Sequence, residues 1–392
     1  MALTFTTAGE SHGPAVIATL FGLPFGHKLD LAWINEQLRR RQGGYGRGGR
    51  QNVERDEVTV LSGLRRELTI GSPLTLVVHN RDSRLDKAPD LPNVRPGHVD
   101  LAGVLKIGSR NARDVLERAS ARETAARVMA GAACQSLLRE FGIEVVAHVL
   151  SIGEVDAAAP QGAGYTRIYR DPAAARAERD AGQFGTIDRA NDAALKQAID
   201  AAKASGDTLG GTIEVVALNL PPGLGSHNHW DQRLDGRLAQ ALMSIQAMKA
   251  VEIGLGAEAA RREGSKVHDS VLPMQPGRGR SPYARGSNNA GGLEGGTTNG
   301  EPLVCRVHMK PISTLMSPLP SVDVSTGKAA NASTERSDTC AVPAAAIVAE
   351  CAVAIVLAQA LLEKTGGDSV EEVRRNLDSY LASLRSFPRD PE

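Results

Sequence analysis

The sequence has few aromatic residues, and its two signs of charge balance. Only 3% of its 392 residues are Phe, Tyr or Trp, so the hydrophobic core must consist mainly of aliphatic and alanine side chains. The 45 basic and 45 acidic residues give a formal net charge of zero. General affinity of the surface for nucleic acid or acidic membranes is therefore not expected, and basic character must be local to matter.

Cysteines and long hydrophobic runs are also scarce. No two of the four cysteines show the Cys-x-x-Cys spacing, which favours buried free thiols in a reducing compartment. The chain opens without a basic-then-apolar signal. Its most apolar run, Val342 to Leu362, is just long enough to span a bilayer but contains Glu350 and Gln359, so a buried helix explains it better. We expect a cytoplasmic protein without a membrane partner. The cysteines are Cys134, Cys305, Cys340 and Cys351.

A hydrophobic content of 42% is enough for a substantial core, and its periodicity predicts both kinds of element. Strands and helices follow one another without a regular βαβ rhythm, which favours an α+β fold. Residues 155–187, rich in Ala, Gly, Pro and charge, predict a surface excursion, and 263–300 and 316–341 predict loops. Strands are predicted at residues 3–22 with a loop at 9–13, and at 57–63, 69–79, 143–154, 212–219 and 304–310. Helices are predicted at residues 29–41, 113–138, 190–205, 234–251, from 343 onward, and at 369–384.

The predicted helix at 113–138 carries the strongest local signal. Ser120 and Glu123 fit a Ser-x-x-Glu capping box, and Gly131 with several alanines makes one face thin enough for close packing. Arginines at its start oppose the helix dipole, so they indicate an anion site built from the cap, backbone N–H groups and guanidinium groups. Alternatively, this is a surface helix whose arginines pair with nearby acids. The arginines are Arg113, Arg118, Arg122 and Arg127.

A second cationic stretch, residues 39–50, contains five arginines and five glycines within twelve positions. Arg/Gly-rich segments of disordered proteins bind RNA. This one does not repeat and lies between predicted ordered elements, so an ordered loop that clamps a small polyanion is the better interpretation. A Lys-containing Walker motif is absent, which leaves nucleotide hydrolysis without support.

Three titratable residues lie in polar loops that suit acid–base chemistry. His12 is flanked by small residues in Gly-Glu-Ser-His-Gly, and a histidine near neutral pH can give or take a proton. His98 precedes a predicted helical region, and Asp338 lies in a loop before a core helix. Each has an ordinary structural alternative, as a turn or solvated residue. His227 and His229 have no Cys or carboxylate cluster nearby, so no metal site is expected.

An ordered series of motifs over about 340 residues resembles the chorismate synthase family. The resemblance implies anti-1,4-elimination of phosphate from 5-enolpyruvylshikimate 3-phosphate, giving chorismate. It implies a need for reduced FMN without net redox, a layered β/α/α/β sandwich and a homotetramer. We expect one domain over residues 1–392, with a mobile Arg/Gly loop at about 39–50. The motifs are AGESHG (8–13), RRQGGYGRGGR (40–50), RPGHVDLAG (95–103), ERASARETAARV (117–128), DTLGG (207–211), MSIQAMKAVEIG (243–254), NAGGLEGG (289–296), MKPIST (309–314) and RSDTCAVP (336–343).

The resemblance also implies roles for individual residues. His12 is expected to protonate the leaving phosphate, His98 to protonate the reduced flavin, and Asp338 to assist removal of the C6 proton through flavin N5. Substrate-binding positions are Ser11, Arg41, Arg47, Arg50, Ser120, Arg122 and Arg336. Flavin or NADPH positions are Arg41, Arg47, Arg118, Ala119, Ser120, Gln246, Ala247, Gly295, Lys310, Pro311, Ile312, Ser313, Thr314 and Arg336.

Some positions depart from the family pattern. Ile107, Ser109 and Asn111 follow the RPGH motif, Ala250 stands where Gly is usual, and Leu255 where Asp is usual. A flavin-binding redox or sensing module without lyase activity is the alternative function, and intact His12, His98 and Asp338 argue against it. NADPH could reduce the flavin directly, but no reductase domain is visible, so an external flavin reductase is expected.

Overall fold

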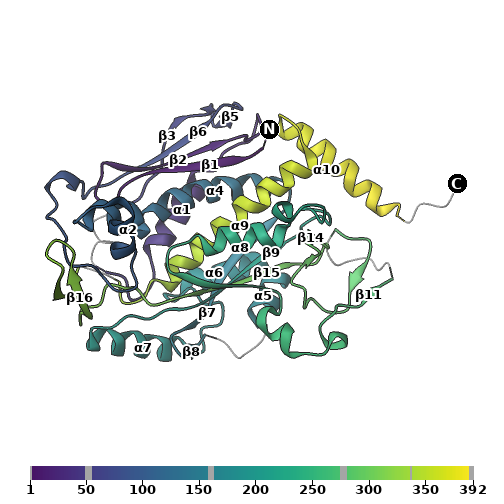
Figure 1. The fold of residues 1–392 in the computed structure, drawn as a ribbon. Helices are drawn as coiled ribbons and strands as arrows, with labels where there is room; N and C mark the ends of the chain where they lie inside the picture. The colour runs from purple at the N-terminus through teal and green to yellow at the C-terminus, as the bar shows by residue number, and fades with distance from the viewer. Residues whose placement is uncertain (1, 49–54, 158–162, 274–279, 336–337, 388–392) are drawn as a thin grey trace.

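The computed structural model describes residues 2–48, 55–157, 163–273, 280–335 and 338–387. Two antiparallel sheets form its outer layers, and helices fill the space between them (Figure 1). The first sheet has the order β1-β2-β6-β3 and the second has the order β10-β15-β9-β7-β8. The first comprises β1 (Thr4–Gly9), β2 (Ala15–Phe21), β3 (Thr59–Ser62) and β6 (Leu74–His79). The second comprises β7 (Glu144–Ile152), β8 (Val155–Asp156), β9 (Gly211–Leu218), β10 (Met248–Ile253) and β15 (Leu303–Met309).

The helices between the sheets form two layers. α1 and α4 pack together, with α4 against the first sheet, while α9 packs on β7 and β9 of the second sheet and α8 on β10. The order of layers is therefore β/α/α/β, as expected, and the fold is α+β. The two central layers consist of α1 (Leu31–Gln42) and α4 (Thr124–Glu140), and of α8 (Leu234–Met243) and α9 (Val342–Thr365).

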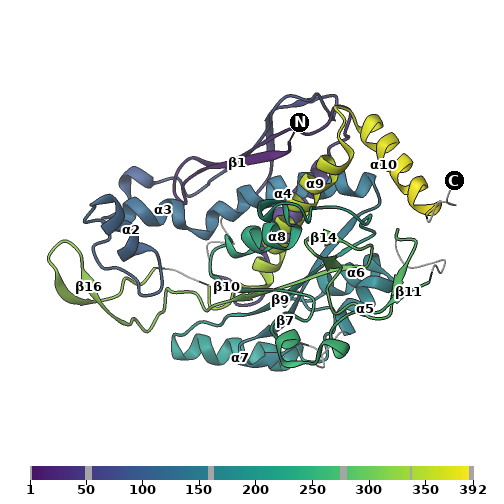
Figure 2. The same ribbon diagram turned by 45° about the vertical axis from the view of Figure 1, so that its right-hand side comes forward.

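The remaining elements lie around this sandwich. α2 (Asp100–Ile107) and α3 (Arg113–Ala119) lie at one end together with the β16–β17 hairpin, and α10 (Val370–Arg385) lies at the other (Figure 2). Residues 155–187, predicted as a surface excursion, contain α5 and α6, whose buried Ile168 and Ala175 pack on the outer side of the second sheet. The other elements are α5 (Ala163–Arg170), α6 (Pro172–Ala181), α7 (Asp192–Ser205), β4 (Leu64–Arg65), β5 (Leu68–Thr69), β11 (Val271–Leu272), β12 (Ala284–Arg285), β13 (Leu293–Glu294), β14 (Thr297–Thr298), β16 (Pro320–Asp323) and β17 (Lys328–Asn331).

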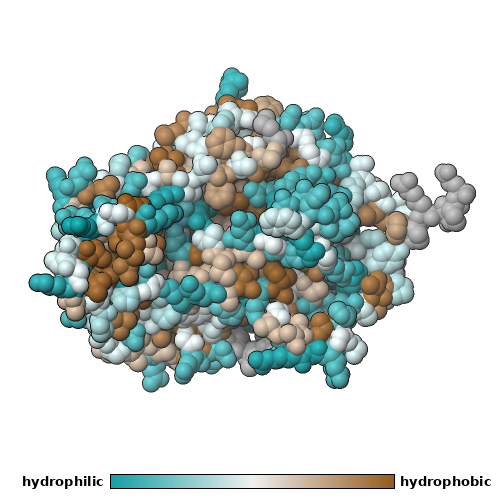
Figure 3. Space-filling view, in the orientation of Figure 1, coloured by the Kyte–Doolittle hydropathy of each residue, from teal (hydrophilic) through white to brown (hydrophobic). Residues whose placement is uncertain are grey.

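The most apolar helix, α9, lies in the core. Within the described part of the chain it is the one helix long and apolar enough to cross a membrane, and 94% of its apolar window is buried in the protein. The surface view shows hydrophobic side chains gathered at the end that contains α2 (Figure 3). There Leu101, Leu105 and Ile107 are exposed.

The predicted loops at 263–300 and 316–341 contain short hairpin strands, β11 to β14 and β16 to β17, and two helix predictions are wrong. The chain does not run as one helix from 113 to 138, because α3 ends at Ala119 and Ser120 adopts an extended ψ of 144° before α4. Ser120 Oγ accepts from the N–H of Arg122, and the Glu123 carboxylate accepts from Thr7 and Arg127, so the predicted capping box is not formed. The bond from Thr7, 116 residues away, is the one that a local sequence pattern cannot reveal.

The predicted helix at 234–251 is also wrong in its second half. α8 ends at Met243, Ala247 turns the chain with a φ of +68°, and residues 248–253 form β10 beside β15. Pairing with β15, which lies more than 50 residues later in the chain, supplies the backbone hydrogen bonds that a helix would have made.

Gly131 explains how α4 and α9 come together. A Cβ built at Gly131 would lie 2.6 Å from both Cα and the carbonyl oxygen of Cys351 in α9. The thin face predicted for this helix is therefore real, and its partner is the most buried helix of the fold.

We expect Gly131→Ala to lower the free energy of unfolding by about 1–3 kcal/mol, because α4 and α9 must separate to admit the methyl group. Gly236→Ala is the matched control, since Gly236 lies in α8 and its built Cβ meets nothing closer than 3.9 Å. That control should be neutral or gain up to about 1 kcal/mol in helix propensity. Urea unfolding of both variants measures the difference, and a Gly131→Ala protein as stable as the parent would contradict the packing argument.

Candidate active site

A cavity of about 1280 Å³ opens between the two sheets at the end of the sandwich nearest α2 and α3. Its walls come from segments far apart in sequence: the β1–β2 loop, the end of α1, the break between α3 and α4, the α8–β10 turn, the segment after β15 and the start of α9. The sequence motifs at 8–13, 40–50, 95–103, 117–128, 243–254 and 309–314 all contribute to it.

The cavity lining is strongly cationic although the chain as a whole is neutral. Nine Arg and Lys side chains line it, against three carboxylates from Asp and Glu, among the residues that the structure describes. Near a protein surface, a unit charge at about 4 Å from another contributes about 4 kcal/mol, so several such groups strongly favour a polyanionic ligand. The cations are Arg41, Arg47, Arg81, Arg84, Arg95, Arg113, Arg122, Lys249 and Lys310, and the acids are Asp82, Glu335 and Asp338.

His12 is held in one orientation by Glu117. Its Nδ1 lies 2.9 and 3.0 Å from the two carboxylate oxygens of Glu117, and its backbone N–H donates to the same carboxylate. Burial acts to raise the pKa of Glu117, but hydrogen bonds from His12 and Arg113 outweigh it and hold that pKa below its usual value. An ionised carboxylate can only accept, so Nδ1 of His12 carries the proton. Nε2 lies on the cavity side of the ring, 3.8 Å from Oδ2 of Asp82.

His98 has a similar arrangement on another wall. Its Nδ1 is hydrogen-bonded to the carboxylate of Asp100, which is fully buried and also accepts from Nε of Arg95 at 2.8 Å. Burial opposes ionisation of Asp100, yet the hydrogen bonds from His98 and Arg95 lower its pKa well below the usual range. Nη1 of the same arginine donates to Thr314 at 3.1 Å, which ties the histidine to the segment after β15.

Two arginines, Arg41 of α1 and Arg122 of the segment between α3 and α4, share one buried carboxylate. Nη1 of Arg122 lies 2.7 and 2.8 Å from the oxygens of Asp56, and Nη2 of Arg41 lies 3.2 Å from it. Burial lowers the pKa of Arg41 to about 10, while Asp56 opposes this shift, so the guanidinium stays charged at neutral pH. Both arginines keep a buried donor, Nε of Arg41 and Nη2 of Arg122, for which the described residues provide no acceptor.

Asp338 meets the Arg/Gly segment directly. Its carboxylate lies 2.7 Å from Nη1 of Arg47 and accepts from the N–H of Gly48 at 2.6 Å. The N–H of Thr339 donates to the carbonyl of Gly46, so residues 46–48 lie along the segment that leads into α9. The Arg/Gly segment and the motif that contains Asp338, both predicted to belong to the site, are therefore in contact.

The structure brings most of the predicted site residues to this cavity and places two of the described ones elsewhere. Arg118 points away, because its guanidinium donates to the carbonyl oxygens of Thr7 and Gly9, and Gly295 lies in the turn between β13 and β14. Arg50 and Arg336 lie outside the described residues. The predicted residues that line the cavity are Ser11, His12, Arg41, Arg47, His98, Ala119, Ser120, Arg122, Gln246, Ala247, Lys310, Pro311, Ile312, Ser313, Thr314 and Asp338.

Of the four arginines that suggested an anion site near residue 120, two lie at the cavity. Arg113 and Arg122 line the cavity, whereas Arg127 pairs with Glu123 and donates to Ser244. Pairing with acids, the alternative for this stretch, is therefore found for Arg113, Arg122 and Arg127, and the anion site at Arg113 and Arg122 stays a prediction. The sequence did not predict that Asp56 binds Arg122, and it indicated Glu117 only as a partner for an arginine. Asp56 is 66 residues from Arg122 and Glu117 is 105 residues from His12, so no local pattern indicates these contacts.

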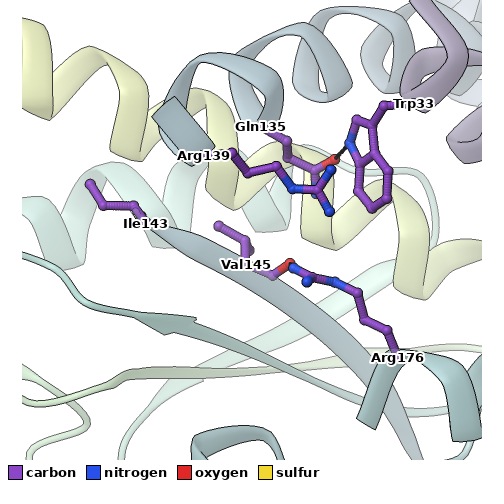
Figure 4. A pocket seen from close by; sticks show the side chains of 6 residues that line it. All are labelled: Trp33, Gln135, Arg139, Ile143, Val145 and Arg176. Carbon is purple, nitrogen blue, oxygen red and sulfur yellow. Dashed lines mark hydrogen bonds between the residues drawn. The ribbon is translucent and has the colours of Figure 1, made fainter. Parts of the chain in front are cut away.

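A second, small crevice lies between α1, the end of α4, β7 and α6 (Figure 4). The guanidinium of Arg139 stacks 3.4 Å above the Trp33 ring, and Nε1 of Trp33 donates to Gln135 at 2.9 Å. The crevice has essentially no free volume, so it is packed protein and cannot admit a ligand. The candidate site is the large cavity.

These features are those of an enzyme whose cationic cavity suits a small polyanion and contains histidines oriented by carboxylates. A profile of the family described as chorismate synthase matches residues 3–362. The chorismate synthase of Trichlorobacter lovleyi is 53% identical over 400 residues, covering 98% of this chain and 100% of that protein. That of Aquifex aeolicus is 49% identical over 398 residues, covering 98% of this chain and 99% of that protein. A crystal structure of chorismate synthase superimposes with a TM-score of 0.81 at 44% identity, covering 99% of both chains.

The chain belongs to the chorismate synthase family, and it is a lyase that forms chorismate, an intermediate of aromatic biosynthesis. Ile107, Ala250 and Leu255, which depart from the family pattern, are not among the described residues that line the cavity.

Proposed function

We propose that this enzyme eliminates phosphate from 5-enolpyruvylshikimate 3-phosphate in an anti-1,4 sense, and that it requires reduced FMN without net redox. One observation carries the proposal: a histidine fixed by a buried carboxylate faces a cavity lined by nine cations. A substrate with two carboxylates and a phosphate matches that excess of positive charge. The substrate itself then completes the neutralisation of a site that is otherwise strongly cationic.

The cavity suits a flavin as well as the substrate. Its volume of about 1280 Å³ exceeds the roughly 300–1,000 Å³ of a pocket for one drug-sized ligand. Nε of Arg47 and Oε1 of Gln246 are buried and have no partner among the described residues, as expected where a polar cofactor would complete the hydrogen bonds. Gln246, Ala247 and residues 310–314 would hold FMN. When bound, reduced FMN supplies electron density and a nitrogen base beside the substrate.

His12 would act as the acid for the leaving phosphate. With Nδ1–H committed to Glu117, the protonated ring presents Nε2–H to the cavity, where a phosphate oxygen can receive it. Arg41 and Arg122 would hold the anion through their remaining donors. Removing a proton from His12 leaves a neutral imidazole that still donates to Glu117, so the ring keeps its orientation through the step.

His98 and Asp338 would hold protons at the other side of the reacting centre. Nδ1 of His98 is engaged by Asp100, so its Nε2 is the atom that would carry a proton toward the cofactor. Asp338 would assist proton removal from C6 of the substrate, and its contact with Arg47 keeps the carboxylate in place near the Arg/Gly segment.

Anaerobic phosphate release, with FMN reduced by dithionite, tests the proposed function. We expect phosphate and chorismate to appear together, only with reduced FMN. Release without flavin would contradict the cofactor proposal. No release from folded, FMN-saturated protein would favour the alternative, a flavin-binding module without lyase activity. Replacing dithionite by NADPH tests the source of electrons, and an unchanged flavin spectrum is expected if an external reductase supplies them.

We further propose a cytoplasmic homotetramer whose subunit is a single domain over residues 1–392. One hydrophobic cluster that includes residues of both sheets and the central helices supports the single domain. The exposed apolar side chains of α2 support self-association, because such patches commonly mark interfaces. Sedimentation of the purified protein measures the assembly. Movement of the Arg/Gly segment at about 39–50 stays a prediction.

A further inference from the structure

Asn80 lies directly after β6 and joins two parts of the site that are distant in sequence. The residue is buried, with 8% of its surface exposed. Nδ2 lies 3.1 Å from the carbonyl oxygen of Glu10, 3.3 Å from that of Ser11 and 2.7 Å from that of Gly13. One amide group thus gathers the carbonyl oxygens on both sides of His12.

The other atom of the same amide holds an arginine. Oδ1 of Asn80 accepts from Nε of Arg122 at 2.8 Å, and the far end of that guanidinium lies against Asp56. Arg122 is thereby fixed at both ends, which determines where its remaining donor, Nη2, can point. The Asn80 backbone N–H donates to the carbonyl of Pro14, so the backbone of Asn80 is also bonded to the β1–β2 loop that carries His12.

We infer that Asn80 is a positioning residue that sets the distance between the His12 imidazole and the Arg122 guanidinium. The inference rests on the proposed function, in which His12 gives a proton to an anion held by Arg122. Asparagine suits this position for a chemical reason: it offers donors at one end and an acceptor at the other. Three carbonyl oxygens require the donor end and the guanidinium requires the acceptor end, so neither Asp nor Leu can replace both.

Asn80→Asp removes the contact with the carbonyl oxygens and keeps the contact with Arg122. An ionised carboxylate can still accept from Arg122, but it places an oxygen against three carbonyl oxygens, so the loop that carries His12 must move away. We expect kcat for phosphate release to fall by about 10²-fold, the typical cost of a displacement near 1 Å, while KM changes little. Asn80→Leu loses both contacts, and we expect kcat to fall and KM to rise.

Asn376→Asp is the matched control. Nδ2 of Asn376 donates to the carbonyl of Thr365 at 2.9 Å in the α9–α10 region, away from the cavity. The Asn376→Asp variant loses a hydrogen bond of the same kind, from a side-chain amide to a backbone carbonyl. We expect its kcat and KM to stay at the parent values. If Asn80→Asp does not fold, Asn80→Ser, which can donate to one carbonyl, should show a smaller change of the same sign.

A readout independent of turnover separates this inference from the proposed function. The ring ¹⁵N signals of His12 in the resting protein, assigned by their loss in His12→Ala, report the Nδ1–H tautomer held by Glu117. We expect them to change in Asn80→Asp and to stay unchanged in Asn376→Asp. Parent-like ring signals together with parent-like kcat would overturn the positioning role. Altered ring signals with an unchanged kcat would leave that role standing and overturn the acid role of His12.

Discussion

His12→Ala is expected to lower kcat for phosphate release by about 10²- to 10⁴-fold, the usual contribution of a positioned general acid. The fold should survive, because the Glu117 carboxylate still accepts from the His12 backbone N–H at 2.9 Å and from Arg113 at 3.2 Å. Binding of FMN and substrate should change little, since the arginines that attract the anion are untouched.

Turnover with dithionite-reduced FMN, and equilibrium titration with oxidised FMN, measure the two effects separately. His229→Ala is the control: His229 is exposed, does not line the cavity, and its loss should leave kcat unchanged. His98→Ala should also reduce kcat with ligand binding largely intact. A His12→Ala protein that turns over normally would contradict the acid role, and one that unfolds or fails to bind FMN would assign His12 a structural role.

Glu350→Ala is expected to lower the free energy of unfolding by about 3–5 kcal/mol, the cost of breaking a buried ion pair. Glu350 is fully buried in α9 and accepts from Gln135 at 2.9 Å, from the N–H of Ala147 at 2.8 Å and from Arg179 at 3.0 Å. Nη1 of Arg40 also lies 3.6 Å away. Without the carboxylate, two buried guanidinium groups lose a neutralising charge.

Urea unfolding measures this change, and Glu363→Ala is the control from the same helix. Glu363 pairs with Arg237 at 2.6 Å on the surface, where such a pair contributes about 0–1 kcal/mol. Equal effects of the two substitutions would contradict the argument that burial makes Glu350 indispensable.

Lowering the pH should also destabilise the fold through Glu350. Burial would raise the pKa of Glu350, but Arg40, Arg179 and Arg176 outweigh it and lower that pKa from 4.5 to about 2. Because the folded state has the lower pKa, the carboxylate stabilises the fold above pH 4.5, and this contribution declines as the pH falls toward 2. We expect the stability difference between the parent and Glu350→Gln to shrink over that window. A difference independent of pH would contradict the assignment.

The sequence predicted correctly those helices whose signals lie within the helix itself. Helix α9 was predicted from an apolar run that begins with Pro343, and α10 from amphipathic spacing, where Ser369 and Glu372 form a capping box in the structure. The similar Ser-x-x-Glu pattern at Ser120 did not form one, because Glu123 binds groups from β1 and α4 instead. The same Ser-x-x-Glu spacing thus gave different structures, depending on which other groups compete for the carboxylate.

By itself, the sequence determined the α+β class, through the irregular succession of strand and helix patterns. It also determined the family and the histidines and aspartate proposed for catalysis, since these are carried by short motifs in a fixed order. Only the tertiary structure decided what surrounds them. Glu117 lies 105 residues from His12, and Asn80 lies 42 residues from Arg122, so no local pattern could pair them. The physical reason is that hydrogen bonds and charges act over a few ångströms in space, and the fold determines which residues come that close.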